Sequence, residues 1–147
     1  MARARPPHRE PGPLNRLPVG YRVRALLFAL AIPPALELLP FSRLARWLTR
    51  APGPSRADVD DQALATWVDR ILSRLPWPWR RTCLRRALVL YPLIRRAGRP
   101  VALTIGVRRD PLSAGVTAHA WLTLGEGPYL EADPAHPGRH TPIATFP

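Results

Sequence analysis

Lysine is absent from the sequence. All 22 basic residues are arginine, against 10 acidic residues, and the net charge is +12. A charge of this size is compatible with nucleic-acid binding. However, the arginines are scattered and form no single stripe with interleaved aromatic residues, so the codon usage of a GC-rich bacterial genome explains them better. We therefore expect no nucleic-acid partner, whereas an acidic peptide or protein would suit the bidentate arginine side chain.

Cysteine is nearly absent, because Cys83 is the only one. A disulfide within the chain is therefore excluded, which suits a reducing cytoplasm. A lone thiol is a candidate reactive group. An isolated cysteine is also often no more than a small buried apolar residue. Only the residues around Cys83 can decide between these two interpretations.

Long hydrophobic runs are also missing. The longest, Ala25 to Leu36, contains Pro33-Pro34 and is shorter than the roughly 20 residues that cross a membrane. A polar, proline-rich stretch precedes it, which is unlike a secretory signal. We expect a soluble, cytoplasmic protein in which residues 25–39 pack against the rest of the chain. Contact of this segment with a membrane is the less favoured interpretation.

The 147 residues, of which 46% are hydrophobic, are enough for one domain with a real core. Residues 1–18 hold five of the 20 prolines and are predicted to be a disordered tail. Residues 19–50 are predicted to form a helical segment that Pro33-Pro34 ends or kinks. A Pro- and Gly-containing break follows, and residues 55–147 form the main predicted domain.

Two helices are predicted after this break. The first has Ser55 or Asp58 as its N-cap and carries apolar residues at three- and four-residue intervals. The second begins with Thr82 as N-cap and Cys83 as its first residue, and it stops at Gly98. Its arginines, at positions 85, 86, 95 and 96, are expected mostly on the face away from the core, and Pro92 is expected to kink it.

Strand patterns follow the second helix. Residues 101–107 alternate and are rich in β-forming residues, residues 118–124 are predicted to form a second strand, and a Gly-Glu-Gly turn leads to a third strand at 128–131. Helices followed by an antiparallel sheet predict an α+β domain, with the N-terminal helices packed on a small sheet.

Cys83 at a helix start has a specific chemical meaning. The free backbone N–H groups and the helix dipole stabilise a thiolate there, and the same groups can donate to an oxyanion. A thiol nucleophile also needs a base and a group that orients the base. His119, on the second strand, is the candidate base. Glu131 and Asp133 follow the turn, and because residues two apart share a strand face, both are expected to point the same way.

The order helix-start Cys, strand, His-Ala-Trp strand, turn and acid is that of transglutaminase-like folds, whose Cys–His–Asp triads perform papain-type acyl chemistry. A more specific set of residues resembles the lasso-peptide biosynthesis B protein, in its C-terminal, transglutaminase-like peptidase half. The matching residues are Cys83-Leu84, Arg86-Ala87-Leu88, Leu93, Arg95-Arg96-Ala97-Gly98, Ile105-Gly106-Val107 and His119-Ala120-Trp121.

The resemblance implies a cysteine peptidase, working without a cofactor, that removes the leader from a ribosomally made precursor peptide. A small recognition protein would present the leader, and an ATP-dependent lasso cyclase would act on the freed core. Cys83 would be the nucleophile, and His119 the base and later the acid. The family's third residue lies about twelve positions after the histidine, which is Glu131 here. Asp133 resembles the Asp-Pro ending of broader transglutaminase-like domains, so both acids are kept as candidates.

Three alternatives compete with this interpretation. A zinc site could use Cys83, His119, His136 and His140, but the Pro and Gly between the last two histidines break helical spacing and no Cys-x-x-Cys is present. We therefore expect no metal. A non-catalytic basic adaptor of a biosynthetic complex would need none of this chemistry. An acyl transferase would use the same triad with an amine in place of water.

Overall fold

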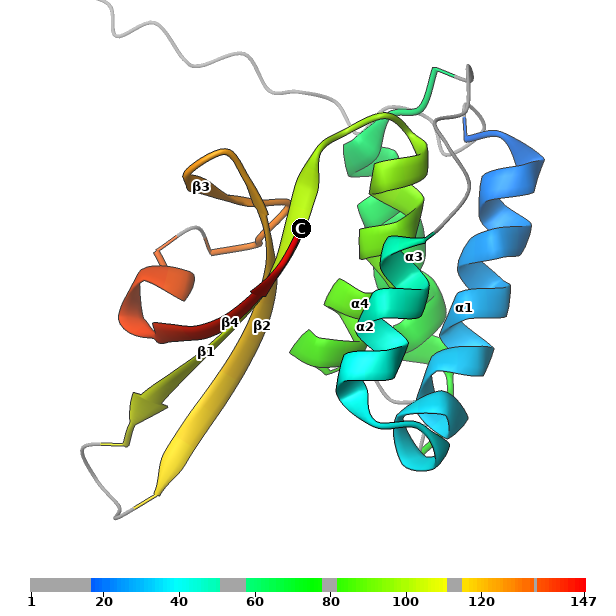
Figure 1. Cartoon of the computed structure of the whole chain (residues 1–147). Helices are drawn as coiled ribbons and strands as arrows, with labels where there is room; N and C mark the ends of the chain where they lie inside the picture. The colour runs from blue at the N-terminus through cyan, green and yellow to red at the C-terminus, as the bar shows by residue number, and fades with distance from the viewer. Residues whose placement is uncertain (1–16, 51–57, 78–81, 111–114, 134) are drawn as a thin grey trace, which may run out of the picture.

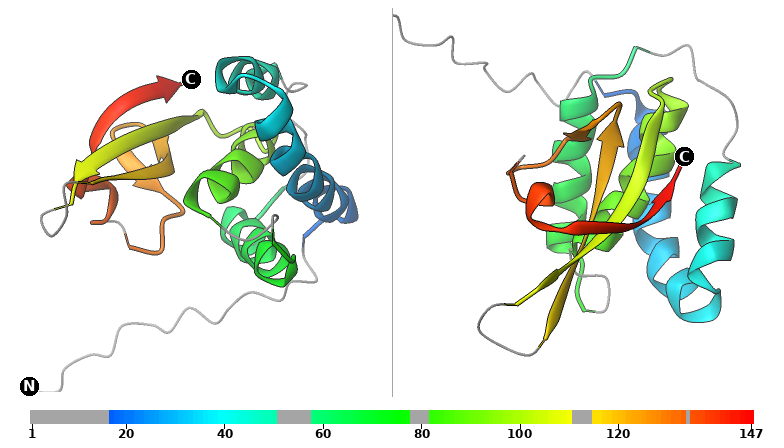
Figure 2. Two further views of the ribbon diagram at one scale, coloured as in Figure 1. Left: turned by 90° about the horizontal axis from the view of Figure 1, so that it is seen from below. Right: turned by 60° about the vertical axis from the view of Figure 1, so that its left-hand side comes forward.

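The computed structural model describes residues 17–50, 58–77, 82–110, 115–133 and 135–147, so nearly all of the predicted tail lies outside the described residues. The chain forms two layers, with helices on one side and an antiparallel sheet on the other (Figures 1 and 2). Among the described residues there are four α-helices and four strands. The predicted α+β class is confirmed.

The first two helices are α1 (Val19–Leu38) and α2 (Phe41–Thr49). Helix α1 continues through Pro33 and Pro34, so the possibility that these prolines end it is wrong. By length and composition alone it could also cross a membrane, and 28% of the apolar window is buried. One face of α1 is nevertheless part of the core, through Ala25, Ala29 and Ile32. This burial offsets the hydrogen bonds that the two prolines remove.

Helix α3 (Asp61–Arg74) begins later than predicted. Its N-cap is Asp60, whose Oδ1 accepts hydrogen bonds of 3.0 Å from the N–H groups of Gln62 and Ala63. Asp58 precedes the cap, and Ser55 lies outside the described residues. The cap position is thus corrected, while the predicted apolar stripe of α3 is confirmed, because Leu64 and its neighbours on that face join the core.

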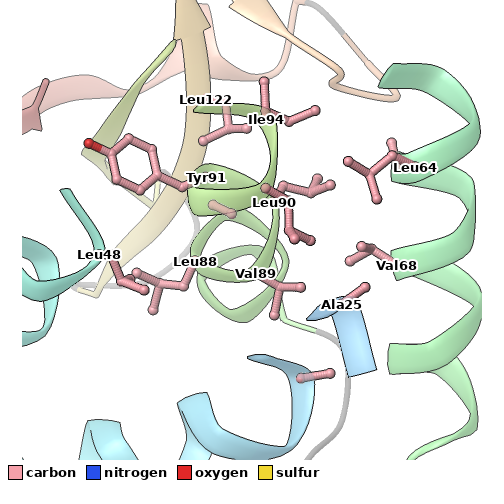
Figure 3. Close-up of a cluster of buried hydrophobic side chains, with 14 of the residues drawn as sticks. Ala25, Leu48, Leu64, Val68, Leu88, Val89, Leu90, Tyr91, Ile94 and Leu122 are labelled. Carbon is pink, nitrogen blue, oxygen red and sulfur yellow. The ribbon is translucent and has the colours of Figure 1, made fainter. Parts of the chain in front are cut away.

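Helix α4 (Cys83–Arg96) starts and ends as predicted, with Thr82 as N-cap and with Gly98 just beyond it at φ 85°. It is the central helix, because every residue from Ala87 to Ile94 is buried. Side chains from α1, α2, α3 and β2 meet those of α4 in the core (Figure 3). The buried part of α4, from Ala87 to Ile94, therefore anchors the first turn of the helix, which carries Cys83.

The sheet has the strand order β3-β2-β1-β4 and is antiparallel throughout. Its strands are β1 (Val101–Arg109), β2 (Val116–Leu124), β3 (Gly127–Tyr129) and β4 (Thr141–Phe146). The first three were expected, although β3 is shorter than predicted. Strand β4 was not expected from the sequence. It follows a short 3-10 helix, η2 (Pro137–Arg139), and pairs with β1.

Contacts with the helical layer hold the end of β4. Phe146 packs edge-on against Phe41 of α2, with ring centroids 5.4 Å apart. The hydroxyl of Tyr91 in α4 donates a 2.5 Å hydrogen bond to the carbonyl of Pro147. The sheet is therefore tied to the central helix beyond the apolar packing of β1 and β2 on α4.

Candidate active site

Cys83 is the first residue of α4, as predicted, and is half-buried. Thr82 caps this end twice: its Oγ1 accepts from the Arg85 N–H at 3.2 Å, and its carbonyl accepts from the Arg86 N–H at 2.9 Å. The N–H groups of Cys83 and Leu84 come before these bonds and have no acceptor within the helix. The thiol thus lies at the positive end of the helix dipole, beside N–H groups that the helix itself does not pair.

His119 projects from β2, near the point where the short strand β3 stops. Its Nε2 lies 3.3 Å from Glu131 Oε2, and the two side chains are only 13% and 12% exposed. A carboxylate at Nε2 favours the tautomer that carries its proton there, with Nδ1 free to act as a base. The sheet thus supplies a histidine that is already paired with an acid.

Glu131, and not Asp133, is the acid that contacts His119. Strand β3 ends at Tyr129 and Leu130 has a φ of 59°, so neither acid lies on a strand. The expectation that both would share a strand face is therefore wrong. Asp133 is exposed, and its Oδ1 accepts a 3.0 Å hydrogen bond from the Ala135 N–H, which is a local turn contact.

Cys83, His119 and Glu131 line one cavity of about 360 Å³. Its remaining lining residues are Thr82, Arg86, Ala120 and Ala132. Among the contacts of the described residues, no hydrogen bond joins the thiol to the imidazole, and the two groups face the same space from α4 and β2. In a site without substrate, catalytic hydrogen bonds are often longer than in the reacting complex.

Aromatic rings surround the imidazole on its other sides. Trp121 is stacked on it, at 5.6 Å between centroids and an angle of 16°. The rings of His136 and His140 lie at 4.6 and 5.4 Å. Gly106, opposite His119 in the strand register, leaves the space that the indole occupies. A Cβ there would lie 2.7 Å from Trp121 Cη2.

This environment changes the acid–base properties of His119. Burial lowers its pKa below the ordinary value of 6.5, and the neighbouring imidazoles of His136 and His140 act in the same direction. The hydrogen bond and the negative charge of Glu131 oppose this effect. An imidazole that is neutral near pH 7 can accept a proton, as a general base must.

The position of Arg86 differs from the prediction. We expected it on the exposed face of α4, but its side chain is only 11% exposed and forms ion pairs with Asp69 and Glu131. A usable signal was present, because Arg86 lies three residues after Cys83 and therefore on the same side of the helix. The sequence pattern likewise did not reveal the roles of Gly106 and Trp121 around the imidazole.

The zinc alternative depends on how His119, His136 and His140 are arranged. Within the described residues, no group of three or more His, Cys, Asp or Glu side chains is placed to hold a metal ion. The Nδ1 of His140 lies 3.1 Å from the carbonyl oxygen of His136. The zinc alternative therefore gains no support from the geometry.

Comparison with known families identifies the architecture. The family model described as the transglutaminase-like superfamily matches residues 26–145. The chain belongs to the transglutaminase-like superfamily. This match spans α1 to β4 and includes every residue of the cavity. It is compatible with a cysteine peptidase or an acyltransferase. Comparisons with curated proteins and with solved structures gave no significant match.

Proposed function

We propose that this transglutaminase-like protein is a cysteine peptidase that removes the leader peptide from a ribosomally synthesised lasso precursor in the cytoplasm. One observation carries the catalytic part of the proposal. A half-buried thiol at a capped helix start and a histidine paired with a carboxylate line the same cavity. The assignment of a lasso precursor follows from the sequence resemblance around Cys83 and His119.

The proposed reaction begins when His119 Nδ1 takes the proton of the Cys83 thiol. The thiolate attacks the carbonyl carbon of the bond between leader and core, and the N–H groups of Cys83 and Leu84, which have no acceptor within the helix, stabilise the oxyanion. The imidazolium then gives its proton to the departing core amine. The leader remains as a thioester on Cys83, and a water molecule, deprotonated by His119, hydrolyses it and releases the leader with a free carboxylate.

In this scheme Glu131 orients the imidazole and stabilises its positive charge while the proton is held. The 3.3 Å approach of Glu131 Oε2 to Nε2 supports this role, as does the low exposure of both side chains. Glutamate replaces the aspartate that is usual in the resembling family, and its extra methylene lets it reach from a segment beyond the end of β3. Asp133 is given no catalytic role.

The partners proposed here are the precursor peptide, a small protein that binds its leader, and the lasso cyclase that uses the freed core amine. The net charge of +12 favours acidic partners by electrostatic steering. The cavity of about 360 Å³ can hold a few side chains of a peptide around the bond to be cleaved. The recognition protein is included because the resembling family uses one to present the leader.

The test is reconstitution from purified components. The protein, the candidate recognition protein and the precursor encoded beside its gene are mixed, and leader release is followed by mass spectrometry. We expect cleavage by the wild type and none by Cys83→Ala, with both proteins equally folded by circular dichroism. Absence of cleavage by the wild type, or equal cleavage by the variant, would refute the peptidase.

Acyl transfer is the outcome that would change the reaction class. An added small primary amine competes with water for the thioester on Cys83, because both are nucleophiles toward the same carbonyl. A peptidase should yield a leader that ends mainly in a carboxylate. A product dominated by the amide at low amine concentration would identify an acyltransferase.

A further inference from the structure

Arg86 is anchored on the helical side of the cavity by a carboxylate. Its Nε donates to Asp69 Oδ1 at 2.8 Å and its Nη2 donates to Asp69 Oδ2 at 3.3 Å. This two-point contact between a guanidinium and a carboxylate fixes the plane of the arginine. Asp69 lies on α3 and Arg86 on α4, one turn after Cys83. The direction in which the guanidinium points is therefore set by two packed helices.

The other edge of the guanidinium faces the segment after β3. Nη2 donates to the carbonyl of Leu130 at 2.8 Å, and Nη1 lies 3.5 Å from Glu131 Oε1. Leu130 has a φ of 59°, a conformation that a non-glycine residue keeps only when its surroundings hold it there. Arg86 thus contacts both the strained residue and the acid that follows it.

Each carboxylate oxygen of Glu131 contacts a different side chain. Oε1 faces Arg86, and Oε2 faces Nε2 of His119. The carboxylate is therefore held on one side while it orients the imidazole on the other. The arginine fork reaches Asp69, a backbone carbonyl and Glu131 from three separate nitrogens, whereas the three donors of lysine share one nitrogen and cannot spread over these positions.

We propose that Arg86 is a positioning residue: anchored by Asp69, it holds Leu130 and Glu131 so that Glu131 orients His119. This inference rests on the proposed function, because it assigns Arg86 to the same catalytic group. The competing interpretation is that Arg86 only ties α3, α4 and the sheet together. The two interpretations differ in whether Arg86 acts through Glu131.

The single cysteine permits a test that needs no peptide substrate. Iodoacetamide can alkylate Cys83 alone, so the mass of the protein reports the reactivity of that thiol at each pH from about 4 to 9. Groups that face His119 and can influence the profile are Glu131, His136, His140 and, across the cavity, Cys83 itself. His119→Ala identifies the part of the profile that depends on the imidazole.

The decisive comparison is a double-mutant cycle of Arg86→Met and Glu131→Gln. If Arg86 acts through Glu131, each single variant lowers the His119-dependent alkylation rate by roughly 10- to 100-fold, and the double variant is no slower than Glu131→Gln alone. Arg86→Lys should not restore the rate. An unchanged profile in Arg86→Met, or an undiminished effect of that substitution in the Glu131→Gln background, would overturn the proposal.

Asp69→Asn provides a second test if Arg86→Met does not fold. It weakens the anchor of Arg86 without touching Glu131, and it should also lower the His119-dependent rate, whereas a wild-type profile in the folded variant would contradict the proposal. Failure of the Cys83–His119 pair, on which the proposed function rests, has a different signature. In that case wild-type alkylation would show no dependence on His119, whereas failure of this inference alone leaves the dependence intact and insensitive to Arg86.

Discussion

Gly106→Ala is the substitution whose effect follows most directly from the geometry. The new Cβ would lie 2.7 Å from Trp121 Cη2 and 3.0 Å from the backbone oxygen of Thr141. Ordinary contact begins at 3.4 Å, so the indole must move by about 0.7 Å. A shift of strand β4 would also be needed, because the Thr141 oxygen belongs to the backbone. Neither group is the flexible end of a side chain.

Overpacking of this kind costs about 2 kcal/mol of unfolding free energy. For a chain of this length the midpoint of thermal unfolding should fall by roughly 4–8 °C. The displacement also reaches the site, because Trp121 is stacked on His119. A displacement approaching 1 Å can lower a catalytic rate by up to about 100-fold. We therefore expect both a less stable protein and a slower alkylation of Cys83 at mildly acidic pH.

The matched control is Gly138→Ala, because a Cβ at Gly138 would meet nothing within 4 Å. Its unfolding midpoint and its alkylation profile should stay close to those of the wild type. Thermal unfolding followed by circular dichroism, together with the alkylation assay, measures both effects in one set of samples. If Gly106→Ala matched the control in stability and in reactivity, the packing argument for Trp121 and His119 would be wrong.

Three further predictions concern single side chains. Glu131→Gln should lower the rate of leader release by roughly 100- to 10,000-fold, since it disturbs the tautomer of His119. Asp133→Asn should release the leader at nearly the wild-type rate. Equal losses in the two variants would contradict the assignment of Glu131. Burial lowers the pKa of His119 below 6.5, so its contribution to stability is complete above about pH 6.5 and is lost as the pH falls below that value. The midpoint of thermal unfolding should therefore fall less on acidification in His119→Gln than in the wild type. An unchanged pH dependence in that variant would argue against a buried neutral imidazole. Burial and the hydrogen bond to Asp61 raise the pKa of Tyr129 to about 12. An ultraviolet titration should therefore show a tyrosine that ionises near pH 12 and is missing in Tyr129→Phe. If the substitution instead removed a tyrosine that ionises near the ordinary pKa of 10.0, this contact would be contradicted.

The parts of the fold that follow local rules could be predicted from the sequence. Helix α4 begins after Thr82 because the threonine side chain can cap a helix, and it ends before Gly98 because glycine can adopt a positive φ. The apolar spacing of α3 predicted a helix, and the alternation of β1 predicted a strand. The prediction that Cys83 and His119 lie together is confirmed, since both line one cavity. It succeeded because the helix and strand that carry them were predicted correctly and follow one another in the order that the family has.

The parts that were missed depend on contacts between distant segments. Strand β4 contains Pro142 and has little alternation, and it is fixed by pairing with β1 and by packing of Phe146 on Phe41. Arg86 is buried because Asp69 and Glu131 meet it from two other elements. Its spacing from Cys83 places it on the side of the site, but the pattern within α4 does not reveal these two partners. The choice between the acids depends on the positive φ of Leu130, since it ends the strand periodicity that made them equivalent.

The central claim is that Cys83 becomes covalently attached to the leader during cleavage. Its most direct test is a rapid acid quench of the protein with its recognition partner and precursor, followed by intact-mass measurement. We predict a transient species heavier than the protein by the mass of the acylated leader, located at Cys83 and absent in Cys83→Ala. Leader release without this species, and at the same rate in Cys83→Ala, would contradict a thiol-based mechanism.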